Sequence, residues 1–535
     1  MSVEEEAFRP DWRLRCIFGV VGLLNFAAAL DATSLSVAIP TIARALGGTS
    51  VEAFWSGTSF LVCSCVFQPV FTLSSAIFGS TRMLFAAVLA FTLGAILAAV
   101  AQEFTLLIIG RCIQGVGGGG IIALTEVLIA DLIPLHERGK WMGFRALTWA
   151  FGAVMGPVIG GALAEHAWRW IFWINLPFCG LGLALIPVVM RLQRDHSPLW
   201  NRLATVDYIG SVLFVGSLSS FLVPLSWGGI MYAWDSWHTL APLIIGAVGL
   251  VVFAIFESAV PKYPLIPMKI FRTPTTVINY FGCFLHGMIM WCVLYYLPLY
   301  YEASLGYSAV IAGASIMPLT LTVAPLSAVT GVLIAKTRRY RTVIWIGWIL
   351  STLGMGIMYL LDTDTTVVQW IFLTLVAGIG VGSLFTAMML AVQASTDPAV
   401  LSIAASMAAF FRTLGQTVGV AVGGVIFQNR VREELSGHAS LSGMASEIAR
   451  DAASLVQYIH SLPLGDGGAD RTSERALLEK SYASALGIVW ATLCGLAGVG
   501  LISSLFMKEY SMVQDFKPQQ GIRGDEGVKV EGEEP

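Results

Sequence analysis

The stretch FGAVMGPVIGG at residues 151–161 decides the fold of this chain. Its glycines recur every fourth residue, so on a helix they form a flat face that allows close packing against a neighbouring helix. The proline removes one backbone hydrogen bond and permits a kink. We interpret the following set as the place where one membrane helix pivots against another: Gly152, Gly156, Pro157, Gly160 and Gly161.

The whole chain has the composition of an integral membrane protein. Of its 535 residues, 56% are hydrophobic and 12% are charged, and that charged share is about half of what a soluble domain carries. So few charges could not cover the surface of a soluble protein of this length. The net charge of −3 excludes a strongly basic nucleic-acid-binding protein.

Apolar segments of membrane-spanning length recur along the chain, and we predict an all-α protein with fourteen transmembrane helices. We expect them at 16–40, 53–78, 83–101, 104–129, 141–164, 168–190, 207–226, 240–257, 275–299, 309–335, 342–361, 367–392, 401–428 and 483–507.

Lys and Arg residues in the short loops predict the orientation. Loops on one side hold thirteen of them: Arg82, Arg138, Lys140, Arg191, Arg194, Arg202, Lys262, Lys269, Arg272, Lys336, Arg338, Arg339 and Arg341. Loops on the other side hold only Arg44 and Arg169. Because positive loops stay in the cytoplasm, we expect both termini there.

Two polar breaks, at 191–206 and 261–275, divide the helices into six, two and six. We predict a cytoplasmic tail at 1–15, a bundle at 16–190, a linker with helices 7 and 8 at 191–274, a second bundle at 275–507 and a cytoplasmic tail at 508–535. The second bundle includes an extracellular loop at 429–482, in which we expect one amphipathic helix. The charged, Gly-rich C-terminal tail is expected to be disordered.

Charges inside spanning helices are costly and usually face a cavity. Asp31 lies in helix 1 and Arg111 in helix 4, and at 1.5 Å per residue both lie roughly 12 to 13 Å below the outer ends of their helices. They can therefore pair across a cavity, with Gln114 on the same face as Arg111. Asp31 could be a carboxylate that takes up and releases a proton, with a pKa set by the neighbouring Arg111. Alternatively, the two residues could form a structural ion pair.

Arg412 lies in helix 13. No acidic residue lies inside any predicted helix between 275 and 428, so the sequence offers Arg412 no obvious counter-ion there. It could bind backbone carbonyls, reach the first bundle or meet an acidic or carbonyl-rich substrate, and Gln416 lies one turn further on the same face. We interpret Glu126 and Arg145 as structural residues near cytoplasmic helix ends, where they can snorkel to water. His286 is interpreted as a packing residue.

Three aromatic residues, Trp291, Tyr295 and Tyr296, lie near the outer part of helix 9. They could form an interfacial belt, or they could line a site for a planar ligand.

Other patterns exclude several kinds of site. The sequence GVGGGG at 115–120 matches G-x-G-x-x-G, but it lies inside a spanning segment without the strand that a dinucleotide site needs. The eight cysteines lie almost all in apolar segments and are interpreted as small fillers. We expect no metal site, because the sequence shows no cluster of metal-ligating residues. We also expect no cofactor. The sequence has no P-loop, so ATP is not expected to drive the protein directly.

Several segments, over roughly residues 19–430, resemble the fourteen-helix drug:H⁺ antiporter branch of the major facilitator superfamily. LDATSLSVAIP at 30–40, IIGRCIQGVGGG at 108–119 and GAVMGPVIGG at 152–161 resemble its motifs in helices 1, 4 and 5. WRWIFWINLP at 168–177 is typical of this branch, and 227–246 and 411–429 resemble fungal members, many of which export toxins or other secondary metabolites. The resemblance implies two six-helix bundles that rock about a central site, and a role of Arg111 in proton transfer.

The segment TLSSAIFGSTRM at 72–83 departs from the branch's motif between helices 2 and 3. Thr72 stands at the first glycine, Ala76 at the acid and Ser80 at the arginine. This loop normally helps to lock the two bundles in one state, so we expect its charge relay to be weakened or rerouted through Asp131 and Arg138.

We therefore expect a proton-coupled antiporter, and no enzyme, that exports a small amphipathic compound such as a toxin, drug or secondary metabolite. It is expected to work as a plasma-membrane monomer whose partners are protons, the substrate and the lipid bilayer. Asp31, Arg111 and Gln114 would couple the proton, and the substrate cavity candidates are Arg412, Gln416, Trp291 and Tyr295. The alternatives are an importer or vacuolar transporter for siderophores or basic amino acids, and a transporter-like receptor with low turnover.

Overall fold

The structure is a computed structural model that describes residues 10–47, 50–190, 192, 199–229, 231–436, 456, 458–460, 462 and 474–512. In this part of the chain, fourteen helices are long and apolar enough to cross a membrane. Each coincides with one of the fourteen predicted segments, which confirms the all-α membrane fold. The amphipathic helix expected in the loop at 429–482, and nearly all of the C-terminal tail, lie outside the described residues.

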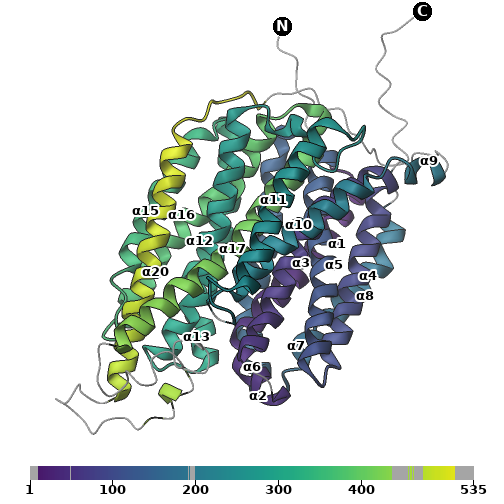
Figure 1. Ribbon diagram of the computed structural model, residues 1–535. Helices are drawn as coiled ribbons and strands as arrows, with labels where there is room; N and C mark the ends of the chain where they lie inside the picture. The colour runs from purple at the N-terminus through teal and green to yellow at the C-terminus, as the bar shows by residue number, and fades with distance from the viewer. Residues whose placement is uncertain are drawn as a thin grey trace, which may run out of the picture.

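The first group of helices supplies six of the spans and forms the purple and blue half of the molecule (Figure 1). Its elements are α1 (Trp12–Ser34), the 3-10 turn η1 (Leu35–Val37), α2 (Ile39–Leu46), α3 (Ser50–Phe78), α4 (Ser80–Ala99), α5 (Phe104–Leu132), α6 (Leu135–Ala167), α7 (Trp170–Trp173) and α8 (Asn175–Val189). Within it, α5 packs along both α3 and α4, and α6 packs along α1.

The second group supplies six further spans, coloured green to yellow. Its elements are α12 (Pro274–Ala303), α13 (Ala309–Ser315), α14 (Met317–Thr337), α15 (Arg341–Met358), α16 (Val367–Ala394), η3 (Pro398–Val400), α17 (Leu401–Ser436) and α20 (Glu474–Ser504). Here α12 packs along α17, and α16 packs between α14 and α15.

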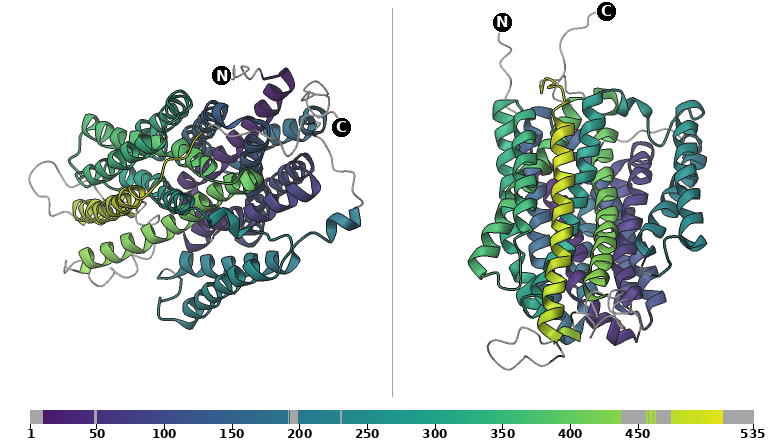
Figure 2. Two further views of the ribbon diagram at one scale, coloured as in Figure 1. Left: turned by 90° about the horizontal axis from the view of Figure 1, so that it is seen from above. Right: turned by 60° about the vertical axis from the view of Figure 1, so that its left-hand side comes forward.

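Two helices, α10 (Tyr208–Trp227) and α11 (Trp237–Ala259), pack mainly on each other and lie beside the two groups (Figure 2). The short α9 (Leu199–Leu203) and the turn η2 (Met268–Phe271) flank them in the chain. Apolar side chains of α11 such as Ile245 and Val251 are 66% and 60% exposed, as expected of a helix that faces lipid.

Several helices are longer than the sequence predicted, among them α6, α17 and α20. α17 continues to Ser436 and α20 begins at Glu474, so the connection between them is shorter than the expected 429–482. Charged side chains one turn apart stabilise these polar ends: Arg430 pairs with Glu433 at 2.6 Å, and Arg475 pairs with Glu479 at 2.8 Å. Hydropathy alone ends a helix where its apolar residues end, so it missed these turns.

The two groups meet along α6 and α14, and along α17 where it packs on α3 and α5. In Figure 1, α1 begins and α20 finishes at one end of the molecule, which we call the terminal end. The opposite end, where α2 and α13 lie, we call the far end (Figure 1). Near the terminal end Gly139 and Gly331 bring the backbones of α6 and α14 so close that a Cβ on either would collide with the other's carbonyl oxygen.

The glycine run of α5 has the same effect inside the first group. A Cβ on Gly119 would collide with the backbone oxygen of Ser64 in α3, and one on Gly117 would collide with the backbone of Phe91 in α4. The run at 115–120 is therefore a packing surface that lets α5 lie between two neighbours.

We predict that Gly119→Ala destabilises the purified protein by about 1 to 3 kcal/mol, because the added methyl group must push two helices apart. The melting temperature in detergent should fall measurably. The matched control is Gly216→Ala on α10, where a Cβ would meet nothing within 4 Å. Equal melting temperatures for the two variants would contradict this account of the glycine run.

Candidate transport site

The predicted partners Asp31, Arg111 and Gln114 form one buried network. Arg111 Nη1 lies 2.5 Å from Asp31 Oδ2, and Gln114 Nε2 donates to Asp31 Oδ1 at 2.8 Å. Arg111 Nη1 also donates to Gln114 Oε1 at 2.7 Å. None of the three residues is more than 1% exposed. The structure thus brings them together as their positions in the sequence indicated, while their role in proton transfer stays a prediction.

Three further groups, which the sequence analysis missed, complete this network. Asn175, at the start of α8, donates from Nδ2 to Asp31 Oδ1 at 2.9 Å. The backbone oxygen of Ser56 accepts from Arg111 Nε at 3.0 Å, and the ring of Phe60 lies 4.5 Å from the guanidinium carbon. Asn175 carries a polar amide inside the apolar stretch WINLP. A search for all polar side chains inside spanning helices, and not for charged ones alone, could have found it.

A second buried charge cluster, formed by Glu126, Arg145 and Arg412, lies where the two groups meet. Arg145 Nη1 of α6 pairs with Glu126 Oε1 of α5 at 2.6 Å. Arg412 of α17 lies within electrostatic range of both. Of the options left open for Arg412, the structure therefore favours contact with the first group. Arg412 also binds a backbone carbonyl, that of Phe385.

The expectation that Glu126 and Arg145 snorkel to water was wrong. They are only 1% and 8% exposed. The hydropathy pattern placed them near helix ends, but α5 and α6 each continue for more than one turn beyond these residues toward the terminal end. Because both side chains are covered by the second group, they pair with each other instead of reaching solvent.

Arg412 has few partners of its own, and the thiol of Cys283 in α12 lies within hydrogen-bonding range of its side chain. Its Nη2 donates to the backbone oxygen of Phe385 at 2.9 Å, and its guanidinium carbon lies 4.1 Å from the centre of the Phe385 ring. Nε and Nη1 have no hydrogen-bond partner among the described residues. His286 also contacts the Phe385 ring, and its Nε2 lies 3.0 Å from the oxygen of Val381, so it is buried and packed as predicted.

Two of the other cavity candidates, Trp291 and Tyr295, contact the first group. Trp291 is 1% exposed, and its ring centre lies 6.5 Å from that of Trp149 in α6. A Cβ on Gly57 of α3 would lie 3.0 Å from the hydroxyl of Tyr295. Burial between helix groups does not fit an interfacial belt, which would require contact with the headgroup region. Gln416 is 8% exposed and lies one turn beyond Arg412.

The glycine motif of α6 packs on α1. A Cβ on Gly152 would lie 2.5 Å from the oxygen of Phe26, and Cβ atoms on Gly156 and Gly160 would collide with Thr33 and Ser34. Pro157 points elsewhere, since it lies 3.1 Å from a Cβ placed on Gly313 of the second group. The motif thus holds α6 against the helix that carries Asp31, and its proline touches the facing group.

Near the terminal end, side-chain hydrogen bonds join the two groups. Gln68 donates to Thr413 at 2.8 Å, and the hydroxyl of Thr72 contacts that of Ser406. Thr72 is one of the residues that depart from the expected motif, and here it binds the second group directly.

Asp131 and Arg138 also reach the second group. Ser402 donates to Asp131, and Arg138 Nη1 donates to Gln393 at 3.1 Å. Arg138 further donates to the backbone oxygens of Ile133 and Ala130 at 2.6 and 2.5 Å. This arrangement fits the expected rerouting of the lock, although Asp131 and Arg138 act here through polar partners in the second group.

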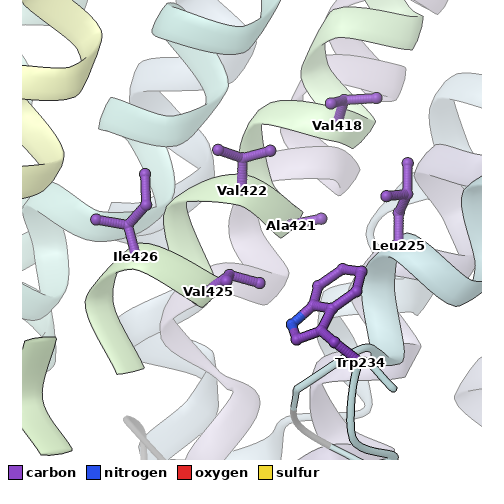
Figure 3. A pocket seen from close by; sticks show the side chains of 7 residues that line it. All are labelled: Leu225, Trp234, Val418, Ala421, Val422, Val425 and Ile426. Carbon is purple, nitrogen blue, oxygen red and sulfur yellow. The ribbon is translucent and has the colours of Figure 1, made fainter. Parts of the chain in front are cut away.

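An apolar cavity lies toward the far end, between α10 and α17 (Figure 3). Its volume is about 230 Å³, and its lining residues are Leu225, Trp234, Val418, Ala421, Val422, Val425 and Ile426. Trp234 rests on Gly228 and Gly229, where any Cβ would collide with the indole. A larger cavity, of about 440 Å³ and lined by residues such as Ile77 and Ile403, lies near the terminal end.

Fourteen membrane-length helices around buried charges at the junction of two groups define a multi-pass membrane transporter. The family model of the Major Facilitator Superfamily matches residues 21–420, and the chain belongs to that superfamily. Proteins of this superfamily carry small-molecule substrates and are transporters rather than enzymes.

Among its relatives is the MFS transporter L2 of a Phoma species, which is 46% identical over 99% of this chain and 88% of its own length. The MFS-type efflux pump LUC4 of a Fusarium species is 31% identical over 99% of this chain and 94% of its own. A bacterial homologue of the human lysosomal transporter Spinster, solved in an inward-facing and unoccupied conformation, shares the fold. Its TM-score is 0.57 at 14% identity, over 93% of this chain and 98% of that one.

We predict that Thr72→Cys and Ser406→Cys together form a disulfide on mild oxidation, because their side chains touch across the two groups. The pair is placed in a chain whose eight natural cysteines are replaced by serine. Peptide mass spectrometry should find the cross-link, and substrate uptake into vesicles should stop until a reductant is added. Thr72→Cys with Gly495→Cys, on α20, is the control that should not react, and a cross-link yield equal to this control would contradict the contact.

Proposed function

We propose that this protein is a proton-coupled exporter of a small amphipathic organic compound. The observation that carries the proposal is the buried carboxylate of Asp31, which accepts hydrogen bonds from Arg111, Gln114 and Asn175. An acid kept inside a membrane domain usually marks an ion or proton pathway. The relatives named as efflux pumps support the direction of transport.

Binding of the proton would change the relative positions of α1, α5 and α8, the helices that carry Asp31, Arg111 and Asn175. Protonation of Asp31 removes its charge and leaves Arg111 without a counter-ion in a site closed to water. The neutral and charged forms therefore favour different positions of these helices, and a compound that binds one arrangement better shifts the population. The predicted bundles at 16–190 and 275–507 would rock against each other, with α6 moving along α14.

The orientation belongs to the same proposal. The terminal end carries most of the Lys and Arg residues in short loops, so we assign it to the cytoplasm and the chain to the plasma membrane. Polar contacts join the two groups at this end. An importer or a vacuolar transporter would use the same helices, and the direction of substrate movement separates it from an exporter.

The test is a proton flux measurement on protein in vesicles that contain a pH-sensitive dye. A panel of amphipathic compounds is added under an imposed pH gradient. We predict that an exported compound drives proton movement in the wild type, and that Asp31→Asn lowers this movement by about tenfold or more because it cannot take up the proton. Glu137→Gln, which alters a partly exposed carboxylate paired with Lys140, is the matched control and should retain the flux.

The melting temperature of each variant shows whether it is folded. Equal compound-driven proton flux in the wild type and in a folded Asp31→Asn would remove Asp31 as the carrier. Substrate transport without any proton movement in the wild type would overturn coupled export itself.

A further inference from the structure

The cluster of Glu126, Arg145 and Arg412 holds two positive charges and one negative charge in a buried position. Arg145 lies 5.5 Å and Arg412 lies 4.1 Å from the centre of the same Phe385 ring, measured from their guanidinium carbons. Glu126 is the one carboxylate in range, and Arg145 holds one of its oxygens at 2.6 Å. One positive charge in this part of the described structure therefore has no ionised partner.

Neutralisation by loss of a proton does not resolve this imbalance, because a guanidinium keeps its proton in proteins. A buried charge is tolerated when it is paired and hydrogen-bonded, and an unpaired one is expensive. Arg412 is 3% exposed, and its Nε and Nη1 lack a partner among the described residues. Such unused donors in a native interior call for an acceptor that binds there.

The surroundings indicate what kind of acceptor fits. The ring of Phe385 and the imidazole of His286 lie against each other beside Arg412. Trp291, five residues along α12 from His286, has an indole nitrogen without a partner among the described residues. A ligand that fits here combines a negative charge for the guanidinium with an aromatic or extended apolar body for these rings.

We propose that the Arg412 cluster binds the anionic group of an amphipathic organic anion, such as a carboxylate, enolate or sulfonate on an aromatic body. This inference rests on the proposed function, since it names the class of compound that the exporter takes. Arg412 accepts the charge, while Arg145 holds one oxygen of Glu126 and so lessens the repulsion between this carboxylate and the ligand, although Glu126 Oε2 has no partner among the described residues. Cationic compounds would meet two guanidiniums and bind poorly.

The experiment compares two fluorescent probes of nearly the same shape. Anilinonaphthalenesulfonate carries a sulfonate, and phenylnaphthylamine is the same ring system without it. The full chain is placed in nanodiscs of phosphatidylcholine, and the signal of empty nanodiscs is subtracted. We expect the wild type to bind the sulfonate probe about tenfold more tightly, as a charge-assisted hydrogen bond to a buried guanidinium implies.

Three variants locate the effect. Arg412→Gln should reduce the preference to within about twofold, since the amide keeps a donor and loses the charge. Arg412→Lys should retain part of the preference. Arg430→Gln, on the same helix but in an exposed ion pair with Glu433, should leave the preference unchanged.

Two results would overturn the inference: equal affinity of the wild type for both probes, or a preference that survives in Arg412→Gln. Failure of the wild type to bind the sulfonate probe above empty nanodiscs counts against it in the same way. The measurement is an equilibrium without a proton gradient, so it is independent of coupled export. Asp31→Asn should keep the probe preference even though it loses proton flux, which separates failure of this inference from failure of the proposed function.

Discussion

The structure depends on the cost of placing a charge between membrane helices without a partner. Arg111 lies against Asp31 and ties α5 to α1, which is distant in sequence. Arg145 lies against Glu126 and ties α6 to α5, the helix that precedes it in the chain. Ion pairs in low dielectric contribute little net stability, but breaking one of them is expensive. The pairs therefore fix which helices are neighbours and at what depth in the membrane each helix lies. Apolar packing and close glycine contacts stabilise the association of the helices.

The sequence predicted the fourteen spans because their length and hydropathy are local properties. It also predicted that Asp31 could meet Arg111, since equal depth in two helices can be counted from their ends. It did not predict that Glu126 and Arg145 stay buried, and it left open whether Arg412 reaches the first group. Those facts depend on which side of α17 faces the first group, and an apolar helix with scattered polar residues carries no clear signal of its facing side.

Near the terminal end, polar contacts join the two groups at the place where the expected motif has changed. Where an acid and an arginine were expected, the chain has Ala76 and Ser80, and yet the groups are joined there by Thr72, Asp131 and Arg138. Hydroxyl and amide partners are weaker than ion pairs and are less costly to separate. A lock of this kind would hold this end with a smaller barrier to opening.

The two charge clusters lie on shared helices but apart from each other. Arg111 and Glu126 are both on α5, fifteen residues apart, which at 1.5 Å per residue is about 22 Å. A proton on Asp31 and an anion at Arg412 would therefore not exchange charge directly. On α12, Tyr295 lies near the first cluster and His286 near the second. Because α5 and α12 each contact both clusters, a shift of either helix is the physical route by which a proton on Asp31 would change access to the second cluster, while the charge of Arg412 still sets which compound is preferred there.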